Sequence, residues 1–213
     1  MLAPGSTIGI LGGGQLGRML AMSAAQLGYR CHIYAPEGDN VAADVAARYT
    51  CAPWHDGDAL AAFARDCDVI TYEFENVPVG PLAGLPQDKL APGIRALEVA
   101  QDRVREKRFM LEAGGTPADF VAVDHDSELA EFSVILVRWR DGEVRFWDST
   151  RNLHKDGILA HCELPAPAIV AEQSARARDM ARKVADALGY VGVLTLEFFA
   201  TSRGPVFNEM APR

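Results

Sequence analysis

Two glutamates near the end of the chain, Glu197 and Glu209, have the type and spacing that most directly suggest chemistry. They lie in apolar runs, residues 191–200 and 205–210, on either side of the turn-forming segment Thr201-Ser202-Arg203-Gly204. This pattern predicts an antiparallel hairpin with Glu197 opposite Glu209 or one position from it, and Cβ atoms roughly 5 to 8 Å apart. Such carboxylates repel each other unless a cation lies between them, and Mg2+ is commonly held by one or two carboxylates plus phosphate oxygens. The pair therefore predicts a site for a metal ion and a nucleotide phosphate, and the alternative is an edge hairpin whose glutamates face solvent.

A glycine-rich turn near the N-terminus is a second candidate site. The pattern Gly12-x-Gly14-x-x-Gly17 follows an apolar run at 7–11 and precedes a helical pattern. Turns of this kind bring backbone amides close to a phosphate at a helix N-terminus. A nicotinamide enzyme would also carry an acidic residue at the end of its second strand, where this chain has Tyr34-Ala35-Pro36. A turn that merely lets helix and strand pack closely is the alternative.

Acidic residues also follow a later apolar strand. Residues 68–72 predict a buried strand that runs into Glu73-Phe74-Glu75-Asn76, and open α/β sheets bind ligands at such strand ends. Glu73 and Glu75 would share a face if the strand continued through them, and a solvated strand exit is the alternative. His154 lies in a polar turn after a strand, although the five histidines show no metal-ligand spacing.

The elements that must position these residues differ between the two halves of the chain. The first half alternates apolar strands, at 7–11, 31–34 and 68–72, with helices, which predicts a parallel sheet with right-handed crossovers. The first helix should end at Gly28. Its expected core-facing stripe comprises Leu16, Met19, Leu20, Ala24 and Leu27.

From Gly93 we expect one continuous helix that ends at Gly114-Gly115 and carries Arg103 and Lys107 on one face. Beyond it, Asp141-Gly142 predicts a two-residue hairpin turn, followed by a helix at 172–188 and the glutamate hairpin. We therefore expect an α/β domain over 1–92 and an α+β domain over 93–213.

Composition suits a soluble globular protein. The 213 residues are 49% hydrophobic and 23% charged, and the net charge of -8 argues against a nucleic-acid surface. The cysteines are scattered and form no C-x-x-C pair, which favours a reducing cytoplasm over disulfides or a zinc site. No signal-like segment or 18-residue apolar run occurs, so we expect a cytoplasmic protein that does not cross a membrane.

Several segments, taken together and in order, resemble one family. They are Gly12–Leu20, Thr71–Pro78, Gln101–Lys107, Asn152–Leu159, Tyr190–Leu194 and Asn208–Arg213. This set, which spans nearly the whole chain, resembles the N5-carboxyaminoimidazole ribonucleotide synthase family of purine biosynthesis, whose members are ATP-grasp enzymes. The resemblance implies that ATP and bicarbonate give carboxyphosphate, whose carboxyl group passes to the exocyclic amine of 5-aminoimidazole ribonucleotide, with release of ADP and phosphate.

The resemblance also implies roles for particular residues. Glu197 and Glu209 would bind Mg2+, and Arg213 would contact bicarbonate or the developing carboxyphosphate. The implied ATP contacts are Arg103, Glu131, His154, Asn208 and Glu209. The implied ribonucleotide site comprises Gly14, Gln15, Leu16, Glu73 and Glu75. A homodimer is expected. Asn208 would point away from Glu209 in a regular strand, so it can share the site only if the strand twists or ends there.

The chain departs from the family pattern in two places. The lid motif G-Y-D-G-K-G is missing: residues 126–129 look like a helix that leads into the lid subdomain, whereas Ala130 begins what looks like the strand after it. The sequence also stops at Arg213, before the family's V-H-N-S-G-H continuation. We therefore expect an ATP-grasp domain that lacks its lid subdomain, is discontinuous at Leu129/Ala130 and is truncated after Arg213. The alternatives are another ATP-grasp ligase of the glycinamide ribonucleotide transformylase or biotin carboxylase type, a nicotinamide-dependent oxidoreductase, and a non-catalytic binding module if the lid is absent.

Overall fold

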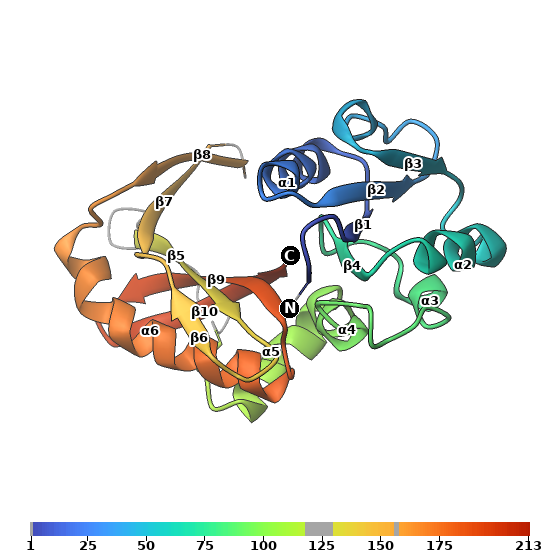
Figure 1. Ribbon diagram of the computed structural model, residues 1–213. Coiled ribbons are helices and arrows are strands. Elements are labelled where there is room, and N and C mark those ends of the chain that lie inside the picture. Colours follow the sequence, from blue (N-terminus) through green and yellow to red (C-terminus); the bar gives the residue numbers. More distant parts are fainter. Residues whose placement is uncertain (1, 118–129, 156–157) are drawn as a thin grey trace. The chain divides into compact units, whose positions relative to one another are not determined.

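The computed structural model describes residues 2–117, 130–155 and 158–213. The chain divides into two compact units, Met1–Glu98 together with Arg213, and Val99–Pro212 (Figure 1). Residues 118–129 lie outside the described part, and so does the Leu129 side of the junction expected at Leu129/Ala130.

The first unit is built on a parallel sheet of four strands in the order β3-β2-β1-β4, which confirms the predicted parallel sheet. Its strands are β1 (Thr7–Leu11), β2 (Arg30–Ala35), β3 (Arg48–Cys51) and β4 (Val69–Tyr72). Its helical segments are α1 (Gln15–Gln26), η1 (Ala43–Val45), α2 (Gly57–Arg65) and α3 (Val79–Leu82). Strand β3 was not predicted, because its sequence Arg-Tyr-Thr-Cys is short, has no apolar run and lies at the sheet edge.

Apolar side chains fill both faces of this sheet. Ile10 and Ile33 belong to a cluster that includes residues of α1, whereas their neighbours Leu11 and Tyr34 belong to a cluster that includes residues of α2. Because successive strand residues point to opposite faces, helices α1 and α2 cover opposite faces of the sheet.

Helix α1 packs through a different face from the one expected. Most of the predicted apolar stripe is exposed, namely Leu16, Met19, Leu20 and Leu27. The buried residues of the helix are Gly17, Ala21 and Ala24. The reason is the close approach of the helix to the glycine turn, since a Cβ at Gly17 would lie 3.0 Å from the carbonyl oxygen of Gly12. The prediction that Gly28 ends the helix fits its positive φ of 83°.

The single helix expected from Gly93 is wrong, because the segment forms α4 (Ile94–Ala100) and α5 (Arg103–Glu112). Asp102 separates them in an extended conformation, and its side chain accepts hydrogen bonds from the backbone amides of Val104 and Arg105. An N-cap of this kind stabilises a new helix start by about 1 kcal/mol. As a result Arg103 becomes the first residue of α5.

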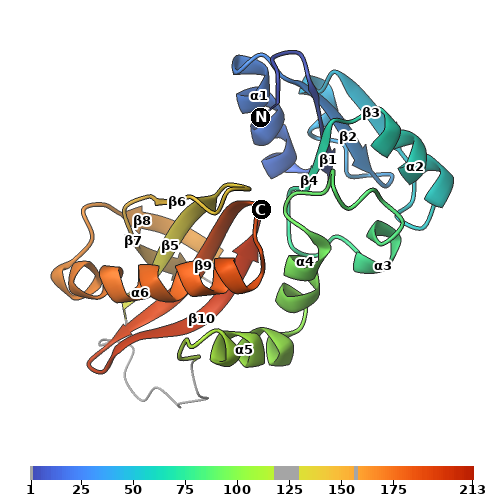
Figure 2. The same cartoon turned by 60° about the horizontal axis from the view of Figure 1, so that its bottom comes forward.

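The second unit contains an antiparallel sheet of six strands in the order β10-β9-β5-β7-β8, with β6 paired to β5 (Figure 2). The strands are β5 (Ala130–Arg138), β6 (Val144–Phe146), β7 (Thr150–Lys155), β8 (Ile158–Glu163), β9 (Gly192–Thr201) and β10 (Gly204–Pro212). The predicted antiparallel texture is therefore confirmed. The predicted two-residue turn is wrong in length, because the Trp139 amide donates to the Glu143 carbonyl and leaves a three-residue loop that ends at Gly142, with φ of 89°.

Helix α6 (Ala168–Ala187) covers one face of this sheet (Figure 2). It begins directly after Pro167, four residues before the expected start. Alternate side chains of β5, β9 and β10 are fully buried, namely Phe132, Val134, Leu136, Leu194, Leu196, Phe198 and Phe207. The rings of Phe132 and Phe198 stack with centroids 5.6 Å apart. This apolar face fixes which side chains point to the other face.

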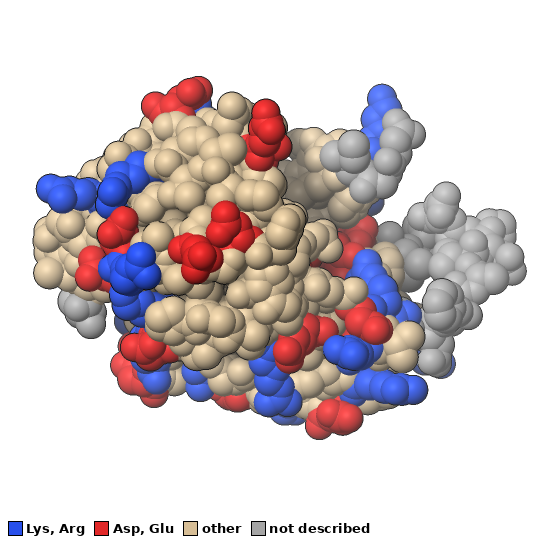
Figure 3. Space-filling view, turned by 90° about the vertical axis from the view of Figure 1, so that its right-hand side faces the viewer, with Lys and Arg blue, Asp and Glu red and all other residues tan. Residues whose placement is uncertain are grey.

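Charged side chains of both signs lie side by side on the surface in Figure 3. Among the described side chains of that face, Lys and Arg form no continuous stripe of the kind that marks a nucleic-acid surface. Within the described ranges, no helix combines the length and the apolar character needed to cross a membrane.

Candidate functional site

The face of the second sheet opposite the apolar one carries the polar residues. Directly paired residues of antiparallel strands point to the same face. The register pairs Glu131 with Asn152, Ser133 with Glu197, and Glu197 with Glu209. These residues alternate with the buried phenylalanines and leucines of the core, so the fold gathers them on one surface.

The pairing of Glu197 with Glu209 is confirmed, but a β-bulge produces it. The hairpin loop is the two residues Ser202 and Arg203, and regular pairing runs from Gly204–Thr201 to Phe207–Phe198. If that register continued, Glu209 would lie opposite Leu196 and point into the apolar core. A shift between Phe207 and Glu209 moves the pairing by one residue. Because a one-residue slip moves side chains to the other face, the bulge brings the two carboxylates together.

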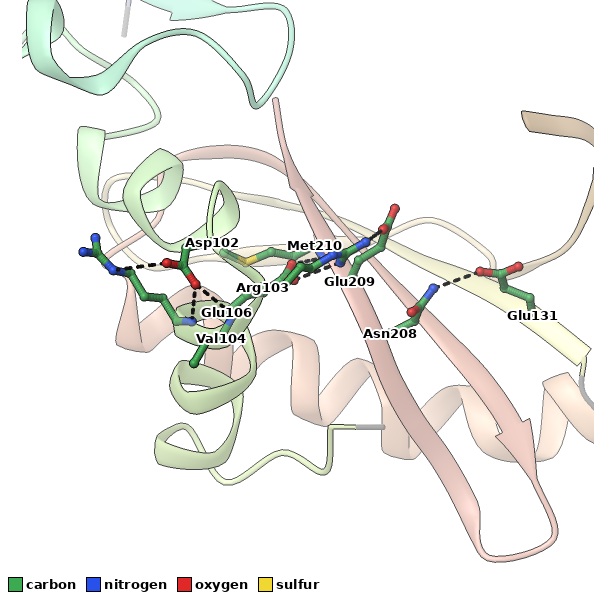
Figure 4. A network of polar contacts seen from close by, with 9 residues as sticks. Asp102, Arg103, Val104, Glu106, Glu131, Asn208, Glu209 and Met210 are labelled. Carbon is green, nitrogen blue, oxygen red and sulfur yellow. Dashed lines mark hydrogen bonds and ion pairs between the residues drawn. The ribbon is translucent and has the colours of Figure 1, made fainter. Parts of the chain in front are cut away.

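The same bulge explains the position of Asn208, which a regular strand would turn away from the site. Asn208 is the extra residue of the bulge, and its Nδ2 donates to Oε1 of Glu131 at 3.2 Å (Figure 4). Because the strand departs from regular geometry at this residue, Asn208 can lie on the same face as Glu209.

Glu131 also contacts His154. Oε2 of Glu131 lies 2.8 Å from Nδ1 of His154, and Glu131, His154 and Glu197 offer ligand atoms that all lie within 4.8 Å of one another. Hard cations such as Mg2+ prefer carboxylate oxygens to imidazole nitrogen. The glutamates are therefore the better Mg2+ ligands, and His154 is placed to orient Glu131.

Electrostatics favour a cation on this face. Burial raises the pKa of Glu197 to about 7, and the carboxylates of Glu209 and Glu131 contribute to the rise, whereas Arg103 acts in the opposite direction. A divalent cation would relieve this repulsion and keep the glutamates ionised at neutral pH. The face thus has a donor set that could hold a divalent metal ion.

Arg103 reaches this carboxylate group from α5. Its Nη2 is ion-paired with Glu209, and its Nη1 donates to Glu106 at 2.9 Å (Figure 4). Glu106 is 2% exposed and was not among the expected site residues. The signal that could have found it is its spacing of three residues from Arg103, which places both on one helix face.

The glycine turn of the first unit is closed by an internal carboxylate. Strand β4 ends at Tyr72, so the condition under which Glu73 and Glu75 would share a strand face is not met. Instead Glu73 is buried, and it accepts hydrogen bonds from the amide of Gly14 at 2.9 Å and from that of Gly17. These amides at the start of α1 are the ones that a dinucleotide pyrophosphate would use. Their bonds to Glu73 argue against a nicotinamide site.

The remaining residues of the expected ribonucleotide site lie near this turn in the chain. Gln15 and Leu16 begin α1, and both are exposed. Arg213 groups with the first unit, where its Nη1 donates to Oε2 of Glu75 at 2.6 Å. The structure therefore brings together Arg213 and Glu75, two residues expected to contact different substrates.

Two sequence families match the chain. Residues 5–101 match the ribonucleotide synthetase preATP-grasp domain, and residues 107–213 match the ATP-grasp domain. The N5-carboxyaminoimidazole ribonucleotide synthase of Brucella melitensis is 40% identical over an alignment that covers 100% of this chain and 75% of that protein. The protein of the same name from Bacillus subtilis is 31% identical, with 100% and 71% covered.

Solved structures give the same result. The crystal structure of N5-carboxyaminoimidazole ribonucleotide synthetase from Thermus thermophilus superposes with a TM-score of 0.85 at 36% identity, and covers 97% of this chain and 71% of that one. The Staphylococcus aureus synthetase complexed with ADP has a TM-score of 0.88 at 27% identity, with 100% and 71% covered. The Brucella alignment extends over 271 residues, more than the 213 of this chain, so that relative contains segments within the matched span that this chain lacks.

Proposed function

The chain belongs to the N5-carboxyaminoimidazole ribonucleotide synthase family, ATP-grasp ligases that carboxylate 5-aminoimidazole ribonucleotide with ATP in purine biosynthesis, and we propose how its own residues carry out that reaction. The observation that carries the proposal is the direct pairing of Glu197 with Glu209 on a face that also presents Glu131 and His154. These groups define a face for ATP and a divalent cation.

Glu197 and Glu209 are the proposed Mg2+ ligands. The donor set fits the ion, because Mg2+ takes oxygen ligands and is commonly held by one or two carboxylates together with phosphate oxygens. When bound there, Mg2+ would neutralise charge on the transferring phosphoryl group.

Arg103, Glu131, His154 and Asn208 are the proposed ATP contacts together with Glu209. The guanidinium of Arg103 suits a phosphate, because it presents several donors in a fixed plane. The carboxylate of Glu131 can accept hydrogen bonds from ribose hydroxyls, and its bonds to His154 and Asn208 hold it in one orientation. These side chains bind and orient the nucleotide, which is most of what phosphoryl transfer requires of a protein.

We propose that the carboxyl group comes from bicarbonate. An oxygen of bicarbonate attacks the γ-phosphorus of ATP, the bond to the ADP oxygen breaks, and carboxyphosphate forms. The exocyclic amine of the ribonucleotide then attacks the carboxyl carbon, loses a proton and releases phosphate. Arg213 is assigned to the carboxyl group, because its planar donors match a carboxylate. Gly14, Gln15, Leu16, Glu73 and Glu75 are assigned to the ribonucleotide site. Within it, the buried Glu73 acts by holding the glycine turn through the amides of Gly14 and Gly17.

A homodimer and a cytoplasmic location stay predictions. Light scattering coupled to size-exclusion chromatography measures the oligomeric state directly. A single mass equal to that of the monomer at all concentrations would contradict the dimer.

The proposed reaction is tested by ADP release in mixtures that each omit one component. We expect release to require Mg2+, and to be fastest when 5-aminoimidazole ribonucleotide and bicarbonate are both present. Release that is indifferent to the ribonucleotide would contradict this substrate. Replacing it by glycinamide ribonucleotide with formate, or by biotin with bicarbonate, tests the two other ATP-grasp alternatives, and faster release with either would favour that alternative.

A further inference from the structure

Glu106 on α5 is a buried carboxylate that the proposed reaction does not use. It is 2% exposed, and burial raises its pKa, whereas the Met210 amide and Arg103 oppose the rise. Burying a carboxylate is unfavourable unless hydrogen bonds and a counter-charge compensate. The contacts that Glu106 makes must therefore compensate the cost of burying its carboxylate.

The first contact is with the backbone of β10. This strand lies at the edge of its sheet, so part of its backbone amides point away from β9. The Phe207 amide donates to the Thr116 carbonyl at 2.8 Å, and after the bulge the Met210 amide donates to Oε1 of Glu106 at 2.6 Å. Thr116 thus binds β10 at Phe207, before the bulge, and Glu106 binds it at Met210, directly after Glu209. Together these contacts hold the register that places Glu209 opposite Glu197.

The second contact is with Arg103. Oε2 of Glu106 accepts from Nη1 of Arg103 at 2.9 Å, while Nη2 of the same guanidinium is directed at Glu209 (Figure 4). The side chain of Glu106 is 1% exposed, whereas those of Arg103 and Glu209 are 58% and 37% exposed. Glu106 therefore anchors the guanidinium from the inside and leaves its outer edge at the carboxylate face.

We propose that Glu106 is a positioning residue for the nucleotide site: one buried carboxylate holds both Arg103 and the bulged strand that carries Glu209. This inference rests on the proposed function. With Glu209 engaged as a metal ligand, Nη2 of Arg103 would be free to bind a phosphate, while Glu106 would retain Nη1 and keep the guanidinium in place. Glu106 itself touches neither metal nor nucleotide.

The test compares Glu106→Gln with Glu112→Gln, which makes the same change at an exposed position of the same helix. Glutamine keeps the oxygen that accepts from Met210 and loses the charge that holds Arg103. A hydrogen bond between charged groups contributes more free energy than one between neutral groups. We therefore expect isothermal titration calorimetry in the presence of Mg2+ to show that Glu106→Gln binds ADP roughly tenfold more weakly than the unsubstituted protein. Glu112→Gln should bind ADP as the unsubstituted protein does. Equal ADP affinity of Glu106→Gln and the unsubstituted protein would overturn the proposal.

A double-mutant cycle separates positioning from a general structural role. If Glu106 acts through Arg103, Glu106→Gln should change ADP affinity less than about twofold in an Arg103→Ala background, because coupled residues are not additive. The same loss in both backgrounds would overturn the proposal. Arg103→Lys provides a variant at an exposed position, and its single ammonium cannot bridge both carboxylates, so it should weaken ADP binding about as much as Glu106→Gln. An Arg103→Lys protein that binds ADP normally would overturn the proposal.

The outcomes distinguish this inference from the function on which it rests. Failure of the unsubstituted protein to bind ADP in the presence of Mg2+ would overturn both. Normal binding by the unsubstituted protein and by Glu106→Gln alike would overturn the positioning role and leave the proposed function standing.

Discussion

Replacement of Glu197 by glutamine should stabilise the metal-free protein at alkaline pH and remove its response to Mg2+. Burial, Glu209 and Glu131 raise the pKa of Glu197 from an ordinary value of 4.5 to about 7. Between these pH values the folded state binds more protons at this site than the unfolded state does. The free energy of unfolding therefore falls as the pH rises through this window, and the full cost is present above pH 7.

The size of the effect follows from the shift. At about 1.4 kcal/mol per pKa unit, the shift corresponds to at most roughly 3 kcal/mol. Because Glu197 is partly exposed, solvent screening reduces this to about 1 to 2 kcal/mol. Glutamine has nearly the same volume and no proton to lose, so the variant should avoid this cost.

Urea unfolding at pH values on both sides of the window measures the effect. We expect Glu197→Gln to be more stable than the unsubstituted protein near pH 8 and equally stable near pH 4.5. At the lower pH, Glu197 is largely protonated in the folded state, and its ionisation stabilises the unfolded state only slightly. Added Mg2+ should stabilise the unsubstituted protein and leave Glu197→Gln unchanged, because binding to the folded state raises apparent stability. Glu112→Gln, an exposed change of the same kind, controls for net charge. A Glu197→Gln protein that is no more stable than the unsubstituted protein at alkaline pH, or that is still stabilised by Mg2+, would contradict this prediction.

Three further predictions concern other parts of the chain. Arg213→Ala should lower the rate of ribonucleotide-dependent ADP release more than the affinity for ADP, and equal losses in both measurements would contradict its assignment to the carboxyl group. Burial and Arg48 lower the pKa of His32 from 6.5, so the free energy of unfolding should fall as the pH drops below 6.5, and His32→Gln should remove this dependence. Parallel urea-unfolding profiles for the two proteins across that range would argue against the His32 prediction. Mass spectrometry of tryptic peptides tests the expected discontinuity at Leu129/Ala130: a peptide in which Ala130 directly follows Leu129 would mean that the junction is real, and residues found between them would support the discontinuity.

The fold could be predicted where apolar runs are uninterrupted. Strands β1, β2 and β4 are apolar because both faces of a parallel sheet are buried. The face of α1 could not be predicted from hydrophobicity, because close approach to the glycine turn selects the small residues Gly17 and Ala21 over larger apolar ones. The break between α4 and α5 depends on a cap at Asp102 in a segment whose overall pattern is helical.

The residues of the candidate site could be predicted from the sequence, whereas much of their geometry could not. Residue spacing and the family resemblance indicated Glu197, Glu209 and Asn208, but their shared face depends on a bulge that no hydrophobic pattern reveals. Glu106 was missed because a glutamate on a polar helix reads as exposed, and its burial depends on a strand about one hundred residues later in the chain.

A crystal structure with Mn2+ and ADP tests the proposed metal site formed by Glu197 and Glu209, because Mn2+ accepts the same oxygen ligands as Mg2+ and has an anomalous signal. We expect an anomalous peak between the carboxylates of Glu197 and Glu209, coordinated also by oxygens of ADP, with Arg103 turned from Glu209 toward the nucleotide. A peak away from these glutamates, or bound ADP with the Arg103–Glu209 ion pair intact and no metal between the carboxylates, would contradict the proposed site.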